Sequence, residues 1–136
     1  MAFLYPIVMN LEELPFKIGM QYEHWEFDLE PVEFAKQYDK YKYIKNDIPI
    51  VLDIEVKHIY LYFNWDILYK VEIIFSTVKP LGIFTVLKGM LEVTFGEQHI
   101  RTEEYLNDIY VIWELEQMKL KLVYNFDLNS VSLEIN

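Results

Sequence analysis

Residues 46–66 read NDIPIVLDIEVKHIYLYFNWD, and residues 107–127 read NDIYVIWELEQMKLKLVYNFD. The two stretches align without a gap at a shift of 61, and seven of their 21 positions are identical. Average composition would give about one or two identities by chance. Most other positions exchange similar residues, such as Ile50 for Val111 and Phe63 for Tyr124. This self-similarity predicts two equivalent structural units within the chain.

Apolar and polar residues alternate within each copy, which is typical of strands that bury one face and expose the other. The residues expected to face the core are Ile48, Ile50, Leu52, Ile54, Ile59, Leu61 and Phe63 in the first copy, and Ile109, Val111, Trp113, Leu115, Leu120, Leu122 and Tyr124 in the second. The residues expected to face solvent are Val51, Asp53, Glu55, His58, Tyr60 and Tyr62, and Ile112, Glu114, Glu116, Lys119, Lys121 and Val123.

Each copy therefore reads as two strands joined by a turn. A tight hairpin is expected at Val56-Lys57 and another at Gln117-Met118, and a four-residue loop in the same register is equally allowed. The cross-strand pairs that this register predicts are Glu55 with His58, Asp53 with Tyr60, Glu116 with Lys119, and Glu114 with Lys121. A third strand is expected after each copy, with the inward residues Ile67, Tyr69, Val71, Ile73 and Phe75, and Val131, Leu133 and Ile135.

Helical spacing of apolar residues precedes the second copy. The pattern predicts a helix over residues 83–95 with Gly96 as its C-terminal cap, although the start of a strand near Leu91 fits as well. A shorter helix is expected over residues 30–40, because Pro31 suits a first helical turn. The phrases Ile18-Gly19-Met20 and Leu81-Gly82-Ile83 indicate a glycine turn before each helix. Residues 22–29 and 2–9 are candidates for additional strands.

The expected fold class is α+β. Two tandem α-βββ repeats, over about residues 16–76 and 79–136, form one antiparallel sheet with the helices on one face. The length of 136 residues and the hydrophobic content of 53% fit a single domain that spans residues 1–136.

Net charge and composition exclude several function classes. The formal charge is −10 and Arg101 is the only arginine, which argues against direct binding of nucleic acid, including the saddle-like use of a duplicated sheet by the TATA-binding protein. The chain has no cysteine, which suits the cytoplasm. We expect no secretion signal and no membrane association, because Pro6 interrupts the apolar N-terminus and no apolar run approaches about 18 residues.

The sequence shows no pattern of a catalytic or metal site. His24, His58 and His99 lie far apart, and no serine sits in a nucleophile motif. The close carboxylates are those expected on the wet side of acidic strands. We therefore expect no catalytic residue, no metal and no cofactor.

The layout resembles the tandem helix-plus-sheet repeat of the beta-lactamase inhibitory protein and of bacterial outer-membrane assembly lipoproteins. Leu81-Gly82, Leu87 and Phe95-Gly96, followed by strands from Ile109, carry this resemblance, and Asp39 departs from it where a second terminal glycine is expected. The resemblance implies an open sheet face that binds another protein. Small acidic immunity proteins and antitoxins are similar in size and charge.

Outward tyrosines mark the candidate binding surface, because tyrosine buries much area at little entropic cost. Tyr60 and Tyr62 fall on the solvent side of the first copy, where the second copy has Lys121 and Val123. The residues we expect to bind a partner protein are Asp53, Glu55, His58, Tyr60, Tyr62, Tyr41 and Tyr43. Glu55 beside His58 would raise the pKa of that histidine.

These features favour a non-catalytic, cytoplasmic inhibitor or immunity-type protein that docks on a partner protein, such as a basic toxin or nuclease. The alternative is a small-molecule binder or enzyme with a pocket between sheet and helices, where His58, Glu55 and Tyr60 would act. A third is a homo-oligomer that uses the free sheet edges.

Overall fold

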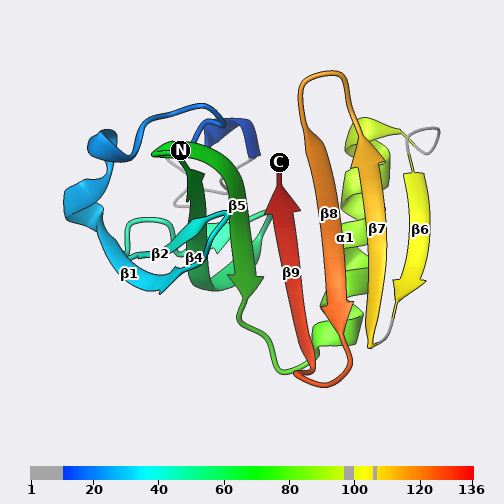
Figure 1. The fold of residues 1–136 in the computed structure, drawn as a ribbon. Coiled ribbons are helices and arrows are strands. Elements are labelled where there is room, and N and C mark those ends of the chain that lie inside the picture. The colour runs from blue at the N-terminus through cyan, green and yellow to red at the C-terminus, as the bar shows by residue number, and fades with distance from the viewer. Residues whose placement is uncertain (1–10, 97–99, 106) are drawn as a thin grey trace, which may run out of the picture.

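The computed structural model describes residues 11–96, 100–105 and 107–136. One large, twisted antiparallel sheet dominates the molecule (Figure 1). Its strands are β1 (Leu29–Phe34), β2 (Asp39–Tyr43), β3 (Ile50–Val51), β4 (Ile54–Asn64), β5 (Ile67–Phe75), β6 (Ile100–Tyr105), β7 (Asp108–Glu114), β8 (Lys119–Asn125) and β9 (Ser130–Ile135). The helical elements are the α-helix α1 (Pro80–Phe95) and the 3-10 turns η1 (Leu11–Glu13), η2 (Tyr22–His24) and η3 (Glu26–Asp28).

Eight strands follow the order β1-β2-β4-β5-β9-β8-β7-β6, and the short β3 pairs only with β4. This arrangement confirms the α+β class and the single antiparallel sheet. It differs from two α-βββ repeats, because the described part of the chain has one α-helix, which lies over the second half of the sheet (Figure 1). No described helix is both long enough and apolar enough to cross a membrane.

The predicted second helix is confirmed, and it begins three residues earlier than expected. Pro80 opens α1 at the first helical position, where its missing N–H removes no hydrogen bond. Gly82 therefore lies inside the helix, and the glycine turn predicted there is wrong. Phe84, Leu87 and Leu91 are buried at helical spacing, and Gly96 ends the helix with a positive φ of 88°.

The helix predicted over residues 30–40 is wrong. Those residues form the edge strand β1, a turn, and the start of β2, and Pro31 is tolerated because an edge strand leaves one side of its backbone unpaired. Side chains of the segment 11–28, among them Leu14, Phe16 and Trp25, pack against the core in the first half in place of a helix. The Phe16 ring packs edge-on against Tyr43 at 4.9 Å, which lets aromatic packing replace a helix there.

The strand proposed over residues 22–29 is also wrong, since that stretch forms η2 and η3 before β1 begins at Leu29. The glycine turn predicted at Gly19 is present, with a φ of +98° and a bond from its N–H to the carbonyl of Leu68 of 2.8 Å. The strand proposed over residues 2–9 lies outside the described residues.

The hairpin predicted at Val56-Lys57 does not exist, because the chain already turns at Leu52-Asp53 and β4 runs on to Asn64. Both turn residues have positive φ, of 52° and 68°. The predicted pairs of Glu55 with His58 and Asp53 with Tyr60 are therefore wrong. Tyr60 instead lies between Lys42 of β2 and Glu72 of β5.

In the second copy the register is two residues away from the predicted one. A four-residue loop joins β7 to β8, so Glu114 rather than Glu116 pairs with Lys119. A shift of two leaves every side chain on its expected face, because the side-chain period of a strand is two. Trp113, Leu120 and Leu122 are accordingly buried, whereas Ile112 and Val123 are buried on the opposite face.

A bulge shifts the register of β5 near its start. Tyr62 pairs with Lys70 and Phe63 with Leu68, so Tyr69 is an extra residue on β5. Leu68 is fully buried as a result, whereas Ile67 is 39% exposed. The inward orientation predicted for Ile67 and Tyr69 is therefore wrong, and that of Val71, Ile73 and Phe75 is confirmed.

The two halves of the sheet meet where β5 pairs with β9. Leu61 pairs with Val71 in the first half, and its repeat equivalent Leu122 pairs with Leu133 in the second. Glu72 follows Val71 in the chain, and Glu134 follows Leu133. These two glutamates pair directly with each other across the junction. The junction is therefore a local two-fold arrangement, and both halves supply the same strand to it.

Truncating the equivalent core leucines tests this arrangement. Leu61 and Leu122 are both 0% exposed, and each lies on the strand next to the junction strand of its own half, β4 beside β5 and β8 beside β9. We expect Leu61→Ala and Leu122→Ala each to lower the free energy of unfolding by about 2–5 kcal/mol, as measured by urea denaturation. Val93→Ala, at an 88% exposed helix position, is the control and should change it by less than about 0.5 kcal/mol. A large loss for only one of the two leucines would contradict their equivalence.

Candidate functional site

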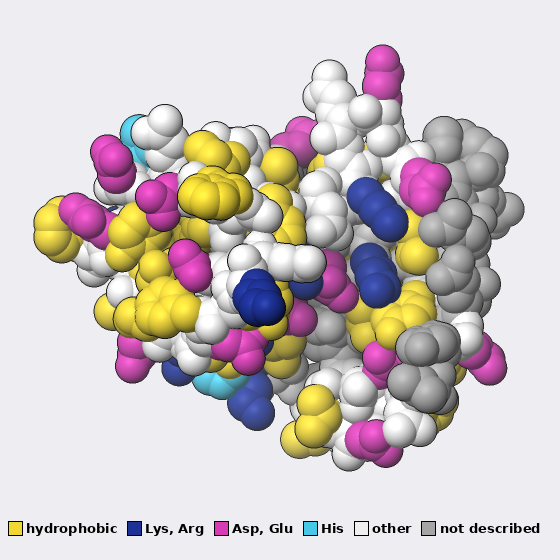
Figure 2. All heavy atoms as spheres, viewed as in Figure 1, with side chains coloured by type: hydrophobic (Ala, Val, Ile, Leu, Met, Phe, Trp, Pro, Cys, Tyr) yellow, Lys and Arg dark blue, Asp and Glu magenta, His cyan; other side chains and the backbone are white. Residues whose placement is uncertain are grey.

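The face of the sheet opposite α1 carries the candidate site. One row of paired residues crosses six strands on this face: Lys42, Tyr60, Glu72, Glu134, Lys121 and Ile112. Figure 2 shows lysine, acidic and hydrophobic side chains intermixed on the face toward the viewer. The acidic wet face that the sequence predicts is therefore present only in part, because lysines alternate there with glutamates.

Lysines lie over tyrosine rings along this face. The ammonium nitrogen of Lys40 is 4.3 Å from the ring centre of Tyr60, and that of Lys70 is 4.1 Å from the ring centre of Tyr62. In the second half, Lys121 lies 3.9 Å from the ring centre of Tyr110. A cation at such distances is attracted by the negative face of the ring, by about 0.5–1 kcal/mol where water has access.

Tyr62 is less accessible than the sequence predicts. It is 7% exposed, and its hydroxyl donates a hydrogen bond of 2.9 Å to Oε1 of Glu72. Burial and the neighbouring Glu72 raise the pKa of Tyr62 well above its ordinary value. Tyr60 is half-buried, and burial followed by Glu72 raises its pKa too. Tyr60 is thus the more accessible of the two predicted contact residues.

Around the junction, the opposed carboxylates have partners of their own. Lys70 lies 3.3 Å from Oε1 of Glu134, whereas Glu72 accepts the bond from Tyr62. Like charges directly opposite each other destabilise a sheet, and these two contacts offset that repulsion. Residues from both halves of the repeat thus stabilise the centre of the face.

Tyr41 and Tyr43 are not surface residues, which corrects the prediction that they contact a partner. They lie in β2 rather than in a loop, and they are 8% and 6% exposed within the core. Burial raises the pKa of Tyr41 to about 12 and also raises that of Tyr43, whose hydroxyl donates a hydrogen bond to Asp47. Their alternation with Lys40 and Lys42 was the signal of a strand.

His58 differs from the prediction in its environment. It faces the helix-free side, but its pKa is lowered, first by burial and then by Lys42 and Lys57. Glu55 is exposed on the same strand and does not raise that pKa, so the predicted carboxylate–histidine pairing is wrong. Asp53 lies in the β3–β4 turn, away from the pair it was expected to form with Tyr60.

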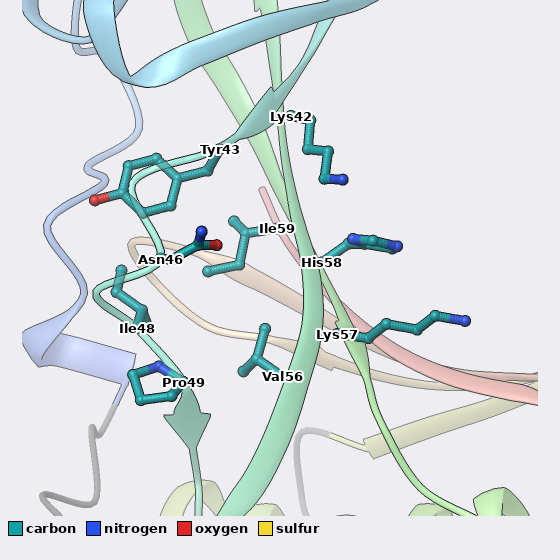
Figure 3. Close-up of a pocket in the computed structure, with 9 residues that line it drawn as sticks. All are labelled: Lys42, Tyr43, Asn46, Ile48, Pro49, Val56, Lys57, His58 and Ile59. Atoms are coloured by element: carbon teal, nitrogen blue, oxygen red, sulfur yellow. The ribbon is translucent and has the colours of Figure 1, made fainter.

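A hollow of about 380 Å³ opens beside His58, where the chain from β2 to β3 passes along β4. Figure 3 shows Lys42, His58 and Lys57 extending to one side of β4, and Tyr43, Asn46 and Ile48 lying on the other. This site lies at the sheet rather than between sheet and helix. A hollow of about 250 Å³ at the end of α1 is lined by Leu52, Leu91 and Phe95, and none of His58, Glu55 and Tyr60 lines it.

Trp65, which the sequence pattern did not single out, is more exposed than the other exposed aromatic residues Phe27, Phe34 and Phe126. It is 95% exposed in the two-residue turn between β4 and β5. Trp65 and Asp66 have φ values of +51° and +62°, as in the type I′ turns that asparagine and glycine favour. Its repeat equivalent, Phe126, is also exposed, at 52%. The aromatic position shared by the two Asn-aromatic-Asp turns was the available signal.

Within the described residues, no group of three or more histidine, aspartate and glutamate side chains is arranged to hold a metal ion. The helix-free face offers aromatic surface, ammonium groups and hydrogen-bonding hydroxyls.

The buried Tyr41 predicts a loss of stability at high pH. The pKa of Tyr41 is about 12 in the folded protein and about 10 when unfolded, so the folded state holds the proton more tightly. Stability is unaffected by this group below pH 10 and falls as the pH rises from 10 toward 12. Between pH 9 and 11.5, we expect the free energy of unfolding to fall by about 1–2 kcal/mol less in Tyr41→Phe than in the unmodified chain. Urea denaturation at pH 9, 10, 11 and 11.5 measures it, and identical pH profiles would contradict the assignment.

The turn at Trp65 predicts a stabilising substitution. A left-handed backbone costs most residues about 1–2 kcal/mol, and asparagine adopts it readily. We expect Trp65→Asn to raise the free energy of unfolding by about 0.5–1 kcal/mol in urea denaturation. Val78 is equally exposed at 95% and has no positive φ, so Val78→Asn should change stability by less than about 0.5 kcal/mol. A destabilised Trp65→Asn variant would show that the indole supports the fold.

The interpretation of this site rests on its own geometry, because comparisons with known proteins found no match. No protein-family model, curated protein or solved structure matches the chain.

Proposed function

We propose that this chain is a non-catalytic protein-binding module, of the cytoplasmic inhibitor or immunity type. Its contact surface is an aromatic strip along β4, defined as Tyr60, Tyr62, Tyr38 and Trp65. Tyr62 forms the buried base of the strip, and the other residues present the accessible surface. The proposal keeps Tyr60 and Tyr62 from the residues expected at the outset, drops the buried Tyr41 and Tyr43, and adds Tyr38 and Trp65.

The observation that carries the proposal is the exposed Trp65. Its indole contributes almost no buried surface to the fold at 95% exposure, and its backbone is in a region that favours other residues. A side chain that adds strain and no packing is best explained by a contact outside the folded chain. Tryptophan and tyrosine are the residues that most often dominate protein–protein binding energy.

Lys40 links two residues of the strip, because its ammonium nitrogen lies 4.3 Å from the ring centre of Tyr60 and 5.4 Å from that of Tyr62. The rings of Tyr38 and Tyr62 meet edge-to-face at 5.5 Å, and Tyr38 and Trp65 line a hollow of about 300 Å³ between two hairpin turns. Asn64 holds those turns together by donating a hydrogen bond of 3.0 Å to the carbonyl of Gln37. A partner side chain that enters this hollow would contact both aromatic residues.

Net charge favours a basic partner. The formal charge of −10 attracts a positively charged protein, such as a nuclease toxin, over distances of about a Debye length. At the strip itself, Lys40 and Lys70 lie against the tyrosine rings and moderate that charge. The acidic residues of the chain therefore supply the long-range attraction, and the aromatic strip supplies the local contact.

A small-molecule binder is the second candidate, favoured by the hollow of about 380 Å³ beside His58. Its volume lies in the range of small-ligand sites, which starts at about 300 Å³. Glu55 and Tyr60 are not among its lining residues, so the chemistry would depend on His58 and the neighbouring lysines.

Site-specific cross-linking tests the protein-binding proposal. Replacing Trp65 with the photoreactive residue p-benzoylphenylalanine in the native host should trap one partner protein on illumination. The same replacement of Val78, which is equally exposed but lies away from the strip, is the matched control and should not trap it. With the purified partner, Trp65→Asn and Tyr60→Ser should each weaken binding by about 10-fold to 100-fold, measured by titration calorimetry.

Trp65→Asn separates a lost contact from a lost fold, because this variant is expected to be more stable than the unmodified chain. Loss of affinity in a variant that is still folded therefore reports on contact. Equal cross-linking from positions 65 and 78, or unchanged affinity in both variants, would refute the strip as the binding surface.

A further inference from the structure

The hollow beside His58 has a basic rim, made of Lys42, Lys57 and His58 (Figure 3). Three groups that are, or can become, positively charged lie together in a chain with 22 acidic and 12 basic residues. Among the described residues, neither Lys42 nor Lys57 has a carboxylate within 4.0 Å, whereas Lys45 and Lys70 each have one. No carboxylate of the described residues therefore forms an ion pair with either lysine of the basic rim.

A β-bulge creates this rim. Val56 pairs with Phe75 and His58 pairs with Ile74, so Lys57 is an extra residue on β4. Without the bulge, strict alternation would direct Lys57 to the side of the core residue Ile59. With it, Lys57 and His58 extend to the same side of the strand (Figure 3). Bulges that redirect side chains are common beside binding sites.

The proximity of the three groups opposes charging of His58. Its pKa is lowered by burial first, and then by the positive charges of Lys42 and Lys57. The nearest acidic residues by register are Glu30, paired with Lys42, and Glu72, paired with Tyr60, while Glu55 lies exposed two residues before Lys57. An anion bound between the lysines would supply the missing negative charge.

We propose that Lys42, Lys57 and His58 form a binding site for an oxyanion, and that its ligand is a phosphate group. Two lysines match the two negative charges of a phosphate at neutral pH, and lysine binds phosphate as a point charge without the planar geometry that arginine requires. The neutral His58 ring has one N–H that can donate a third hydrogen bond, and protonation adds a second donor. Asn46 also lines the hollow, from the other side of β4 (Figure 3).

This site is separate from the aromatic strip, so the two proposals fail independently. Tyr60 adjoins both, with its ring 5.7 Å from that of His58, and is therefore left unchanged in the test. The variants alter only Lys42 and Lys57.

Titration with inorganic phosphate, followed by NMR of the histidine rings at constant ionic strength, tests the proposal. We expect saturable shifts of the His58 ring signals and a rise in its pKa on binding, since a bound anion favours the charged ring. The exposed His24 is the internal reference and should not shift saturably. Lys42→Gln and Lys57→Gln should each weaken binding by about tenfold.

Lys45→Gln is the matched control, because Lys45 is nearby but lies 3.8 Å from Asp47 and outside the rim. It should leave phosphate affinity within about twofold. Acetate distinguishes a phosphate site from general attraction of anions, and it should bind at least about tenfold more weakly because it carries one charge. Non-saturating shifts, equal shifts at His24, equal effects of Lys45→Gln and Lys57→Gln, or equal binding of acetate would each overturn the site.

Discussion

The pairing of β5 with β9 is the constraint on which the rest of the structure depends. It joins two four-stranded halves, β1-β2-β4-β5 and β9-β8-β7-β6, into one sheet, and it buries Val71, Ile73 and Leu133 at the centre of the core. The same pairing forces Glu72 and Glu134 to face each other on the helix-free side. Lys70 and the hydroxyl of Tyr62 offset that repulsion. The charged and aromatic contacts at the centre of this face thus follow from the way in which the halves are joined.

The two halves cover their cores differently, and this difference creates the asymmetry of the surface. In the second half α1 packs on the sheet through Phe84, Leu87 and Leu91. In the first half the segment 11–28 and its aromatic side chains take that place, and β1 and β2 extend the sheet beyond β4. Since β2 brings Lys40 and Lys42 alongside Tyr62 and Tyr60, both proposed sites arise in the half that contains β1 and β2.

Two bulges locate those sites along β4. The bulge at Lys57 sets two basic side chains beside each other at one end of the strand, and the bulge at Tyr69 adjusts β5 near the other end, next to the turn that exposes Trp65. Each bulge interrupts a ladder and alters which face a side chain occupies. Contact surfaces of different chemistry can therefore occupy one strand: a basic rim beside His58 and an aromatic strip toward Trp65.

The sequence by itself determined the fold class and the strand character of the repeat, because a period of two and a spacing of three or four are local properties of the chain. It also determined which faces Leu61, Leu122 and Trp113 occupy, because alternation within a strand assigns a side chain to a face whatever the register with the partner strand. Only the tertiary structure decided where the chain turns, as at Leu52-Asp53, and which residues bulge, because these depend on the partner strand. The burial of Tyr41 and Tyr43 was decided in the same way: β2 becomes an inner strand only when β1 and β4 pair on either side of it. Trp65 stands out only once its turn is known, since exposure and backbone strain are properties of the folded chain.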